Sequence, residues 1–222
     1  MTTLYNICNL LQKLTLRSFA DYSVKGAENV PPYGPLIIVA NHMSNIDPSI
    51  LSVSIGRRLK FLAKHSIFVG FPVSQILYSY GAHPIDREKA DLGAIRWAKL
   101  QLSKDTAMVI FPEGTRNNGQ MIKAKDGAVR LIQMTKSTVL PVGITGTEHH
   151  KSVLRVANPT GQIRVNIGTP FSLPPLDGPV SDAVMRSMTT MIMERIAYLL
   201  PIGYRGYYSL SRTDTTRKDS TE

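Results

Sequence analysis

Short apolar runs rich in β-branched residues alternate along this chain with stretches of helical periodicity, and this alternation constrains the fold more than any other feature. The runs have the length of buried strands and lie at residues 36–40, 59–63, 82–85, 107–111, 138–144 and 163–168. Helical patterns are found at 49–55, 72–79, 88–103, 124–135 and 181–199. Such alternation is typical of α/β architecture, so we predict a single domain with a central mixed sheet flanked by helices.

The start of the chain predicts an amphipathic helix that precedes this domain. At 100° per residue, Lys13 and Arg17 fall on one side of residues 4–19. The opposite side carries Leu4, Ile7, Cys8, Leu11, Leu14 and Phe19. A basic amphipathic helix either binds the surface of a membrane or packs on its own domain, and the sequence leaves both readings open.

Composition sets the limits of the domain prediction. The 222 residues are enough for one domain with a substantial core. We divide them into a membrane-interface segment at 1–30, a main domain at 31–205 and a polar tail at 206–222. No run approaches 18 apolar residues, so we expect no transmembrane helix, and no secretory signal is evident. The single cysteine, Cys8, excludes an internal disulfide and any zinc site made of several cysteines.

The formal charge of +10 indicates a polyanionic partner. A membrane surface, a nucleic acid and a phosphorylated substrate all satisfy this condition. The basic residues are dispersed, apart from those at 57–64, and neither zinc-finger spacing nor an RNA-binding aromatic pattern occurs. We therefore expect no nucleic acid among the partners.

The first apolar run is followed at 41–47 by the stretch Asn-His-Met-Ser-Asn-Ile-Asp. A histidine removes a proton near neutral pH, and a carboxylate beside it orients the ring and stabilises its charge. Five residues of a regular helix turn by about 140°, so contact between His42 and Asp47 requires an irregular turn. The alternative is an ordinary loop histidine, with Asp47 capping a helix that has Pro48 at its first position.

Three further blocks accompany this stretch. They are Gly-Ala-His-Pro-Ile-Asp-Arg at 81–87, Phe-Pro-Glu-Gly-Thr-Arg at 111–116 and Val-Leu-Pro-Val-Gly-Ile at 139–144. In this order and at this spacing, the four blocks resemble those of the glycerolipid acyltransferases, and most closely those of the 1-acylglycerol-3-phosphate acyltransferases. The resemblance covers residues 30–170.

The resemblance implies an enzyme of phospholipid biosynthesis that needs no cofactor. Such an enzyme transfers a fatty acyl group from a thioester, acyl-coenzyme A or acyl carrier protein, to the hydroxyl of the lysophospholipid 1-acylglycerol 3-phosphate (lysophosphatidate), giving phosphatidate. It implies direct attack, with His42 as general base and Asp47 as its orienting partner. No Gly-x-Ser-x-Gly elbow exists, and Cys8 lies far from every block, so no protein nucleophile is indicated.

The acceptor and the class of protein stay open at this point. An acyltransferase of the same fold with another acceptor, glycerol 3-phosphate or an amino-lipid, fits the blocks as well. A basic membrane-binding module without catalysis is the alternative from a different class, and the presence of both His42 and Asp47 argues against it. For the enzyme we expect peripheral attachment to the cytoplasmic face of a membrane.

A phosphate-bearing acceptor needs fixed cations, and a guanidinium forms two parallel hydrogen bonds with phosphate. Arg116 is therefore the main candidate, and we expect Glu113 either to orient Arg116 or to accept a hydrogen bond from a hydroxyl. Gly114 permits a backbone conformation closed to other residues. With two phosphate ligands implied by the resemblance, Lys64 and Arg87, the expected substrate-binding residues are Lys64, Arg87, Glu113, Gly114, Thr115 and Arg116.

One residue departs from the family pattern. Pro84 stands where the family usually has phenylalanine, and proline removes a hydrogen-bond donor from a strand. We therefore expect this strand to lie at an edge of the sheet or to be interrupted. The run Lys-Asp-Gly at 125–127 also resembles a family run, without a role that the sequence defines.

Other motifs are weaker. Gly114 and Gly119 have the spacing of a phosphate-binding loop, but Gln120 replaces the lysine that such a loop requires. The Glu-His-His run at 148–150 lacks the two-histidine helical spacing of zinc proteases, so we predict no metal site. The methionines of 181–199 fit a helix that fills the core, or one that contacts an acyl chain.

Overall fold

A seven-stranded mixed sheet forms the centre of the molecule in the computed structural model, which describes residues 2–86, 91–176 and 181–209. The strands are β1 (Ala20–Lys25), β2 (Leu36–Ala40), β3 (Leu59–Lys64), β4 (Ala82–Ile85), β5 (Ala107–Ile110), β6 (Thr138–Thr145) and β7 (Gly161–Ile167). Their spatial order is β1-β7-β6-β2-β5-β3-β4. β6 and β7 pair antiparallel and the other neighbours pair parallel, so the predicted mixed α/β sheet is confirmed.

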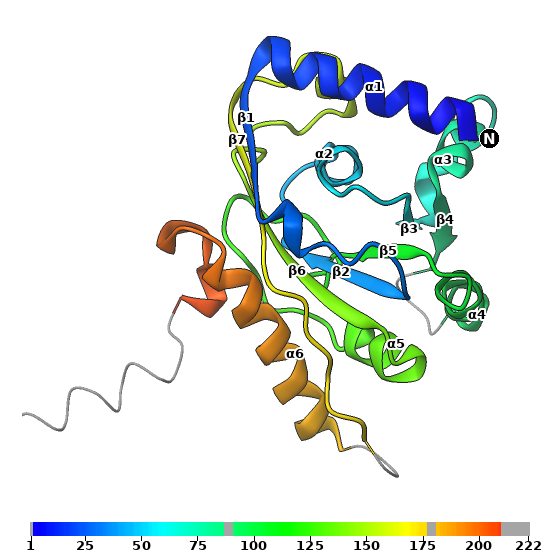
Figure 1. Cartoon of the computed structure of the whole chain (residues 1–222), viewed down its shortest axis with the longest axis vertical. Helices are drawn as coiled ribbons and strands as arrows, with labels where there is room; N and C mark the ends of the chain where they lie inside the picture. The colour runs from blue at the N-terminus through cyan, green and yellow to red at the C-terminus, as the bar shows by residue number, and fades with distance from the viewer. Residues whose placement is uncertain (1, 87–90, 177–180, 210–222) are drawn as a thin grey trace, which may run out of the picture.

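Helices cover both faces of the sheet (Figure 1). They are α1 (Thr2–Phe19), α2 (Asp47–Ser54), α3 (Val73–Tyr80), α4 (Leu92–Leu102), α5 (Gly127–Thr135) and α6 (Asp182–Tyr198). Short 3-10 helices in the described part of the chain lie at Ala27–Asn29, His65–Ile67, Val153–Val156, Ile202–Tyr204 and Gly206–Tyr208. In the view of Figure 1, α1, α2 and α3 lie on one side of the sheet and α4, α5 and α6 on the other.

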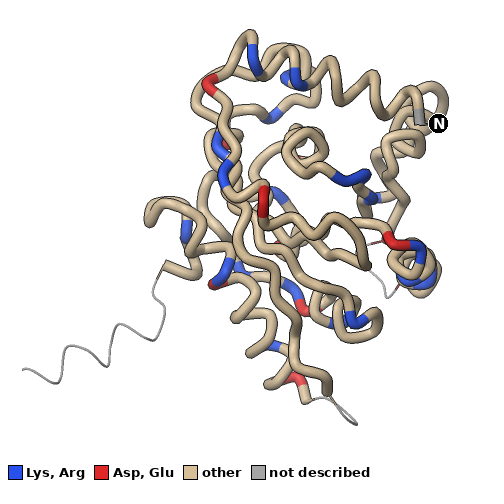
Figure 2. Tube along the Cα trace, viewed as in Figure 1, with Lys and Arg blue, Asp and Glu red and all other residues tan. Residues whose placement is uncertain are grey.

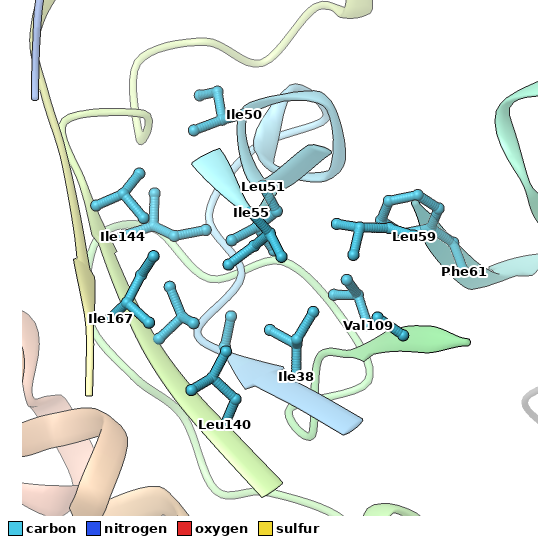
Figure 3. Close-up of a cluster of buried hydrophobic side chains, with 14 of the residues drawn as sticks. Ile38, Ile50, Leu51, Ile55, Leu59, Phe61, Val109, Leu140, Ile144 and Ile167 are labelled. Atoms are coloured by element: carbon cyan, nitrogen blue, oxygen red, sulfur yellow. The ribbon is translucent and has the colours of Figure 1, made fainter. Parts of the chain in front are cut away.

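Strand β2 is central because both of its faces are apolar. Ile38 belongs to the hydrophobic cluster that packs under α1 and α2, and its neighbours Ile37 and Val39 belong to the cluster under α5 and α6. Successive side chains of a strand point to opposite faces, so this one β-branched run contributes side chains to both hydrophobic clusters. Figure 3 shows the first cluster, where side chains of α2 meet those of β2, β3, β5, β6 and β7.

Strand β1 was not predicted. Its sequence, Ala-Asp-Tyr-Ser-Val-Lys, alternates three apolar residues with three polar ones, and it is only half-buried at the edge of the sheet beside β7. Such an edge strand lacks the apolar run that marks a buried strand. The sheet therefore starts before residue 31, where we expected the main domain to begin.

Residues just beyond 205, the expected end of the main domain, also pack against it. The Tyr208 side chain is buried and its hydroxyl accepts a hydrogen bond from the Ala124 backbone N–H at 3.0 Å. The backbone N–H of Tyr207 donates to Met121 O at 2.9 Å. The expected tail at 206–222 thus begins within packed chain, and its remainder, 210–222, lies outside the described residues.

Two expectations about unusual residues agree with the fold. Pro84 lies in β4, which is an edge strand of the sheet. This is where a residue without a backbone N–H donor is tolerated. In α6, Met185, Met188 and Met193 are buried in the second hydrophobic cluster, so these methionines fill the core.

Candidate active site

The sheet brings the first three sequence blocks to one edge. β2, β5, β3 and β4 are consecutive parallel neighbours, so their carboxyl ends point the same way. His42 follows β2, Glu113 follows β5 and Lys64 ends β3. The loops beyond the carboxyl ends of parallel strands form the usual binding crevice of open α/β sheets.

His42 and Asp47 are in contact. The ring Nδ1 of His42 lies 2.8 Å from Asp47 Oδ2, and the same oxygen accepts hydrogen bonds from the backbone N–H groups of Met43 at 2.7 Å and Ser44 at 2.8 Å. The other oxygen, Oδ1, accepts from Thr147 Oγ1 at 2.7 Å. Asp47 is fully buried, so these four donors replace the water that its charge would otherwise need.

The turn between the two residues is irregular, as the contact requires. The residue that caps α2 is Ile46, and Asp47 already lies inside the helix with its carboxylate folded back over the preceding loop. Ser44 Oγ donates to His150 O and accepts from the Ile46 N–H, which holds the turn closed. The alternative role of Asp47 as a helix N-cap is therefore wrong.

The orientation of the His42 ring defines its chemistry. Its ring stacks on Phe111 with centroids 4.0 Å apart and planes 17° from parallel. A carboxylate only accepts hydrogen bonds, so Nδ1 carries the hydrogen shared with Asp47. The lone pair of the neutral ring then lies on Nε2, which is the atom that accepts a proton.

Glu113 joins the third block to the first. Its Oε1 accepts from the His42 backbone N–H at 3.0 Å, and its Oε2 accepts from Asn117 Nδ2 at 2.7 Å and the Ile122 N–H at 2.8 Å. The Asn117 N–H in turn donates to His42 O at 2.8 Å. Burial raises the pKa of Glu113, and the hydrogen bonds from Ile122, Asn117 and His42 act in the opposite direction.

The expected role of Glu113 is corrected by these contacts. Glu113 is 2% exposed and both of its oxygens are occupied by protein donors, so it does not present an oxygen to a substrate hydroxyl. It does not orient Arg116 either. Arg116 Nη1 donates to Asn45 Oδ1 at 2.6 Å, and Asn45 Nδ2 donates to Lys151 O at 2.6 Å. Arg116 is thus positioned by the first block and remains exposed.

Gly114 and Thr115 form the turn between these two residues. Gly114 has φ 71°, in the left-handed region that favours glycine, as predicted. A Cβ on Gly114 would lie 3.3 Å from Lys125 Cδ, so the Lys125 side chain runs beside the turn. Thr115 is exposed, next to Arg116.

Lys64 lines a cavity of about 610 Å³ at the ends of β3 and β4. His83, Asp86 and Asp91 also line it. The His83 ring stacks on Trp97 at 4.2 Å, and burial lowers the pKa of His83 against the opposing effect of Asp91. Arg87, the other expected phosphate ligand, lies outside the described residues.

Several supporting residues were not singled out from the sequence. Asn41 binds β6 through both ends of its amide, donating to Ile144 O at 2.9 Å and accepting from the Ile144 N–H at 2.8 Å. Asn117 and Thr147 hold Glu113 and Asp47 respectively. Thr147 lies 100 residues from Asp47 in the chain, and no local pattern connects them. Asn41, by contrast, stands inside the first block and was within reach of sequence reasoning.

The Glu-His-His run at 148–150 serves the fold. Glu148 accepts a hydrogen bond from the Tyr204 hydroxyl at 2.7 Å, and His150 Nε2 lies 2.9 Å from Thr160 O. Within 2–86, 91–176 and 181–209, no group of three or more His, Cys, Asp or Glu side chains is arranged to hold a metal ion. Over the same residues, no helix combines the length and the apolar character needed to cross a bilayer.

Comparison with known proteins finds related sequences. The family profile described as Acyltransferase matches residues 21–145. The 1-acyl-sn-glycerol-3-phosphate acyltransferase alpha of Mus musculus is 30% identical over 77% of this chain, which spans 63% of that protein's length. The 1-acyl-sn-glycerol-3-phosphate acyltransferase of Bacillus subtilis is 26% identical over 88% of this chain and 96% of its own.

A solved structure has the same fold. The crystal structure of the 1-acyl-sn-glycerophosphate (LPA) acyltransferase PlsC from Thermotoga maritima superimposes with a TM-score of 0.67. The match covers 88% of this chain and 79% of that one at 24% sequence identity. At this identity the likeness concerns the arrangement of the helices and strands.

Proposed function

Because this chain belongs to the acyltransferase family, we propose that it transfers a fatty acyl group from a thioester to the free hydroxyl of lysophosphatidate, giving phosphatidate. The single observation that carries the proposal is the buried Asp47 carboxylate 2.8 Å from His42 Nδ1, which leaves Nε2 as a proton acceptor at the edge of the sheet. The names of the mouse and Bacillus subtilis relatives support the choice of acceptor.

The proposed reaction proceeds by direct attack. His42 Nε2 removes the proton of the acceptor hydroxyl as its oxygen bonds to the thioester carbonyl carbon. The tetrahedral intermediate then collapses, the carbon–sulfur bond breaks, and the departing thiolate takes the proton from the imidazolium. Asp47 stabilises the imidazolium through the step, because its buried negative charge lies against the ring.

The acceptor's phosphate is the proposed ligand of the exposed cations. Arg116 has one nitrogen bound to Asn45, which holds the guanidinium in place and leaves its other donors for a ligand. Lys64 lines the cavity at the ends of β3 and β4, and we assign it and Arg87 the same role. Gly114 and Thr115 shape the turn that carries Arg116.

Helix α1 is the proposed site of peripheral attachment to the cytoplasmic face of a membrane. Tyr5, Gln12 and Leu16 pack against the domain, at 5%, 2% and 0% exposure. Most of the predicted apolar side faces outward instead, including Ile7 at 48% and Leu11 at 56%. The two readings of the helix are therefore compatible: one side packs on the domain and the other is available to lipid.

The test is a thioester-consumption assay with the purified full chain. Acyl-coenzyme A and acyl carrier protein donors are each combined with lysophosphatidate, glycerol 3-phosphate, lysophosphatidylcholine and an ornithine-type lipid. We expect lysophosphatidate to be the preferred acceptor and His42→Ala to lower turnover by roughly 10²–10⁴-fold. Preference for another acceptor would refute the choice of substrate, and near-normal turnover by folded His42→Ala would refute the mechanism.

A further inference from the structure

A second exposed apolar segment lies between β3 and the middle of α3. In this β3–α3 segment (residues 65–76), Phe71 is 90% exposed and Val69 is 73% exposed. Ile67, Val73 and Ile76 are also exposed. Folding of the chain alone leaves these side chains in water, and contiguous exposed apolar residues mark a surface for a protein or a membrane.

The tip of this segment is an ordered turn. The Ser74 N–H donates to Gly70 O at 2.8 Å, and Ser74 Oγ accepts from the Gly70 N–H at 3.0 Å. Below it, the Phe68 N–H donates to His65 O at 3.0 Å. These bonds hold Phe71 on the outside of a closed turn.

The surrounding sequence has one sign of charge. Residues 48–85 contain Arg57, Arg58, Lys60 and Lys64 and no aspartate or glutamate. Residues 1–20, which include α1, also contain basic residues and no acidic one. Figure 2 shows blue without red along both stretches. The carboxylates Asp86 and Asp91 lie on the cavity wall at the ends of β3 and β4. An exposed apolar segment within these two basic stretches complements an anionic lipid surface.

Helix α3, in which the β3–α3 segment ends, packs on α1. The Tyr80 hydroxyl donates to Asn9 Oδ1 at 2.9 Å, and the rings of Tyr5 and Tyr80 lie 5.2 Å apart. Figure 1 shows α3 beside the N-terminal end of α1. The two exposed apolar surfaces therefore belong to one packed unit.

The segment also adjoins the cavity at the ends of β3 and β4. Lys64, His65 and Ser66 line that cavity and lead directly into the segment. Phe71 is thus only a few residues along the chain from Lys64 and the cavity that Lys64 lines.

We propose that the β3–α3 segment is a second membrane-insertion element, whose Phe71 and Val69 enter the acyl region of an anionic bilayer. Attachment at α1 and at this segment fixes how the domain sits on the membrane. The cavity beside Lys64 then opens at the level of the lipid headgroups, and a lysophospholipid reaches it without leaving the bilayer. This access route rests on the proposed function, whereas insertion of the segment does not.

Insertion is measured with an environment-sensitive fluorophore on a single cysteine. In a Cys8→Ala background, Phe71→Cys carries the label, and Tyr33→Cys is the matched control. Tyr33 is 75% exposed and lies just before the amino end of β2, whereas the cavity lies at the carboxyl ends of β3 and β4. With phosphatidylglycerol-containing vesicles we expect a blue shift and quenching by spin-labelled acyl chains at position 71 and not at position 33.

Binding and turnover complete the test. Phe71→Ser should weaken partition onto these vesicles by about 10- to 100-fold, the change expected for burying one phenylalanine side chain. Tyr33→Ser should leave it unchanged. Turnover of Phe71→Ser should fall on vesicle-borne acceptor and stay at the wild-type value on a water-soluble short-chain acceptor.

Three results would overturn the proposal. The first is a label at position 71 that stays in water while the protein is bound to vesicles. The second is unchanged partition of Phe71→Ser onto the vesicles. The third is a blue shift of the label that appears without lipid as the protein concentration is raised, which would show contact with a second copy. A label that inserts in a protein without acyltransferase activity would refute the proposed function and leave the membrane element standing.

Discussion

Asp47→Asn tests the central feature of the site, the charge beside His42. Asp47 Oδ2 faces three donors, and Oδ1 faces the Thr147 hydroxyl. An asparagine can place its oxygen at the Oδ2 position and its amide nitrogen toward Thr147, whose hydroxyl also accepts hydrogen bonds. The substitution therefore removes the charge and keeps the geometry.

The expected loss follows from the distance between the two groups. With His42 Nδ1 and Asp47 Oδ2 at 2.8 Å, the centres of charge of imidazolium and carboxylate are about 4 Å apart, which corresponds to about 4 kcal/mol at an effective dielectric constant near 20. At 1.36 kcal/mol for each factor of ten, turnover should fall by about 10³-fold.

The assay is turnover in thioester consumption at saturating acceptor, together with thermal unfolding to establish that the variant is folded. Thr147→Val is the matched control, because it removes a donor to Asp47 and retains the charge. Its cost should appear mainly as about 1–3 kcal/mol of stability, the penalty of one unpaired buried acceptor. Turnover by folded Asp47→Asn within tenfold of wild type would show that the charge does not act in catalysis.

Other perturbations address the proposed phosphate ligand Arg116, the buried carboxylate of Glu113 and the proposed membrane contact of α1. Arg116→Ala should lose about 1.5–3 kcal/mol of binding to phosphate-bearing acceptors, seen as a raised KM, and Arg116→Lys should restore only part because the planar fork is lost. Glu113→Gln should cost about 1–3 kcal/mol in urea unfolding at neutral pH, since its amide would face backbone donors. Burial raises the pKa of Glu113 above its ordinary 4.5, so the folded state keeps this proton up to a higher pH than the unfolded state does. The stability that the protonated carboxyl contributes is therefore lost as pH rises through the folded pKa. Glu113→Gln should remove this pH dependence of the unfolding free energy. Ile7→Asp with Leu11→Asp should release the protein from anionic vesicles and preserve turnover on detergent-dispersed substrate; unchanged co-sedimentation would place the membrane surface elsewhere.

The local pattern predicted the buried strands well because each is a short run of apolar residues. β2 at 36–40 and β4 at 82–85 have the predicted bounds. β1 was missed because an edge strand needs only one apolar face. Three alternating apolar residues, Ala20, Tyr22 and Val24, are too few to distinguish such a strand from a loop. Its place is decided by pairing with β7, more than 130 residues away in the chain.

The contacts of the candidate active site also include some that the sequence could predict and some that it could not. The His42–Asp47 contact was predictable, because both residues belong to one short stretch whose turn brings them together. The role of Glu113 was not predictable, since its hydrogen-bond partners come from separate loops. The sequence of a motif does not show whether its carboxylate faces solvent or the interior. For the same reason the sequence paired Glu113 with Arg116, whereas the fold pairs Arg116 with Asn45.

By itself, then, the sequence determined the succession of strands and helices and the pairing of His42 with Asp47, because these depend on residues close together in the chain. The tertiary structure decided which polar groups are buried, as with Asp47 held by Thr147 from the loop after β6. It also decided which apolar groups are exposed, as with Phe71. Burial is a property of what packs from elsewhere in the chain, so a residue's own neighbours in sequence do not reveal it.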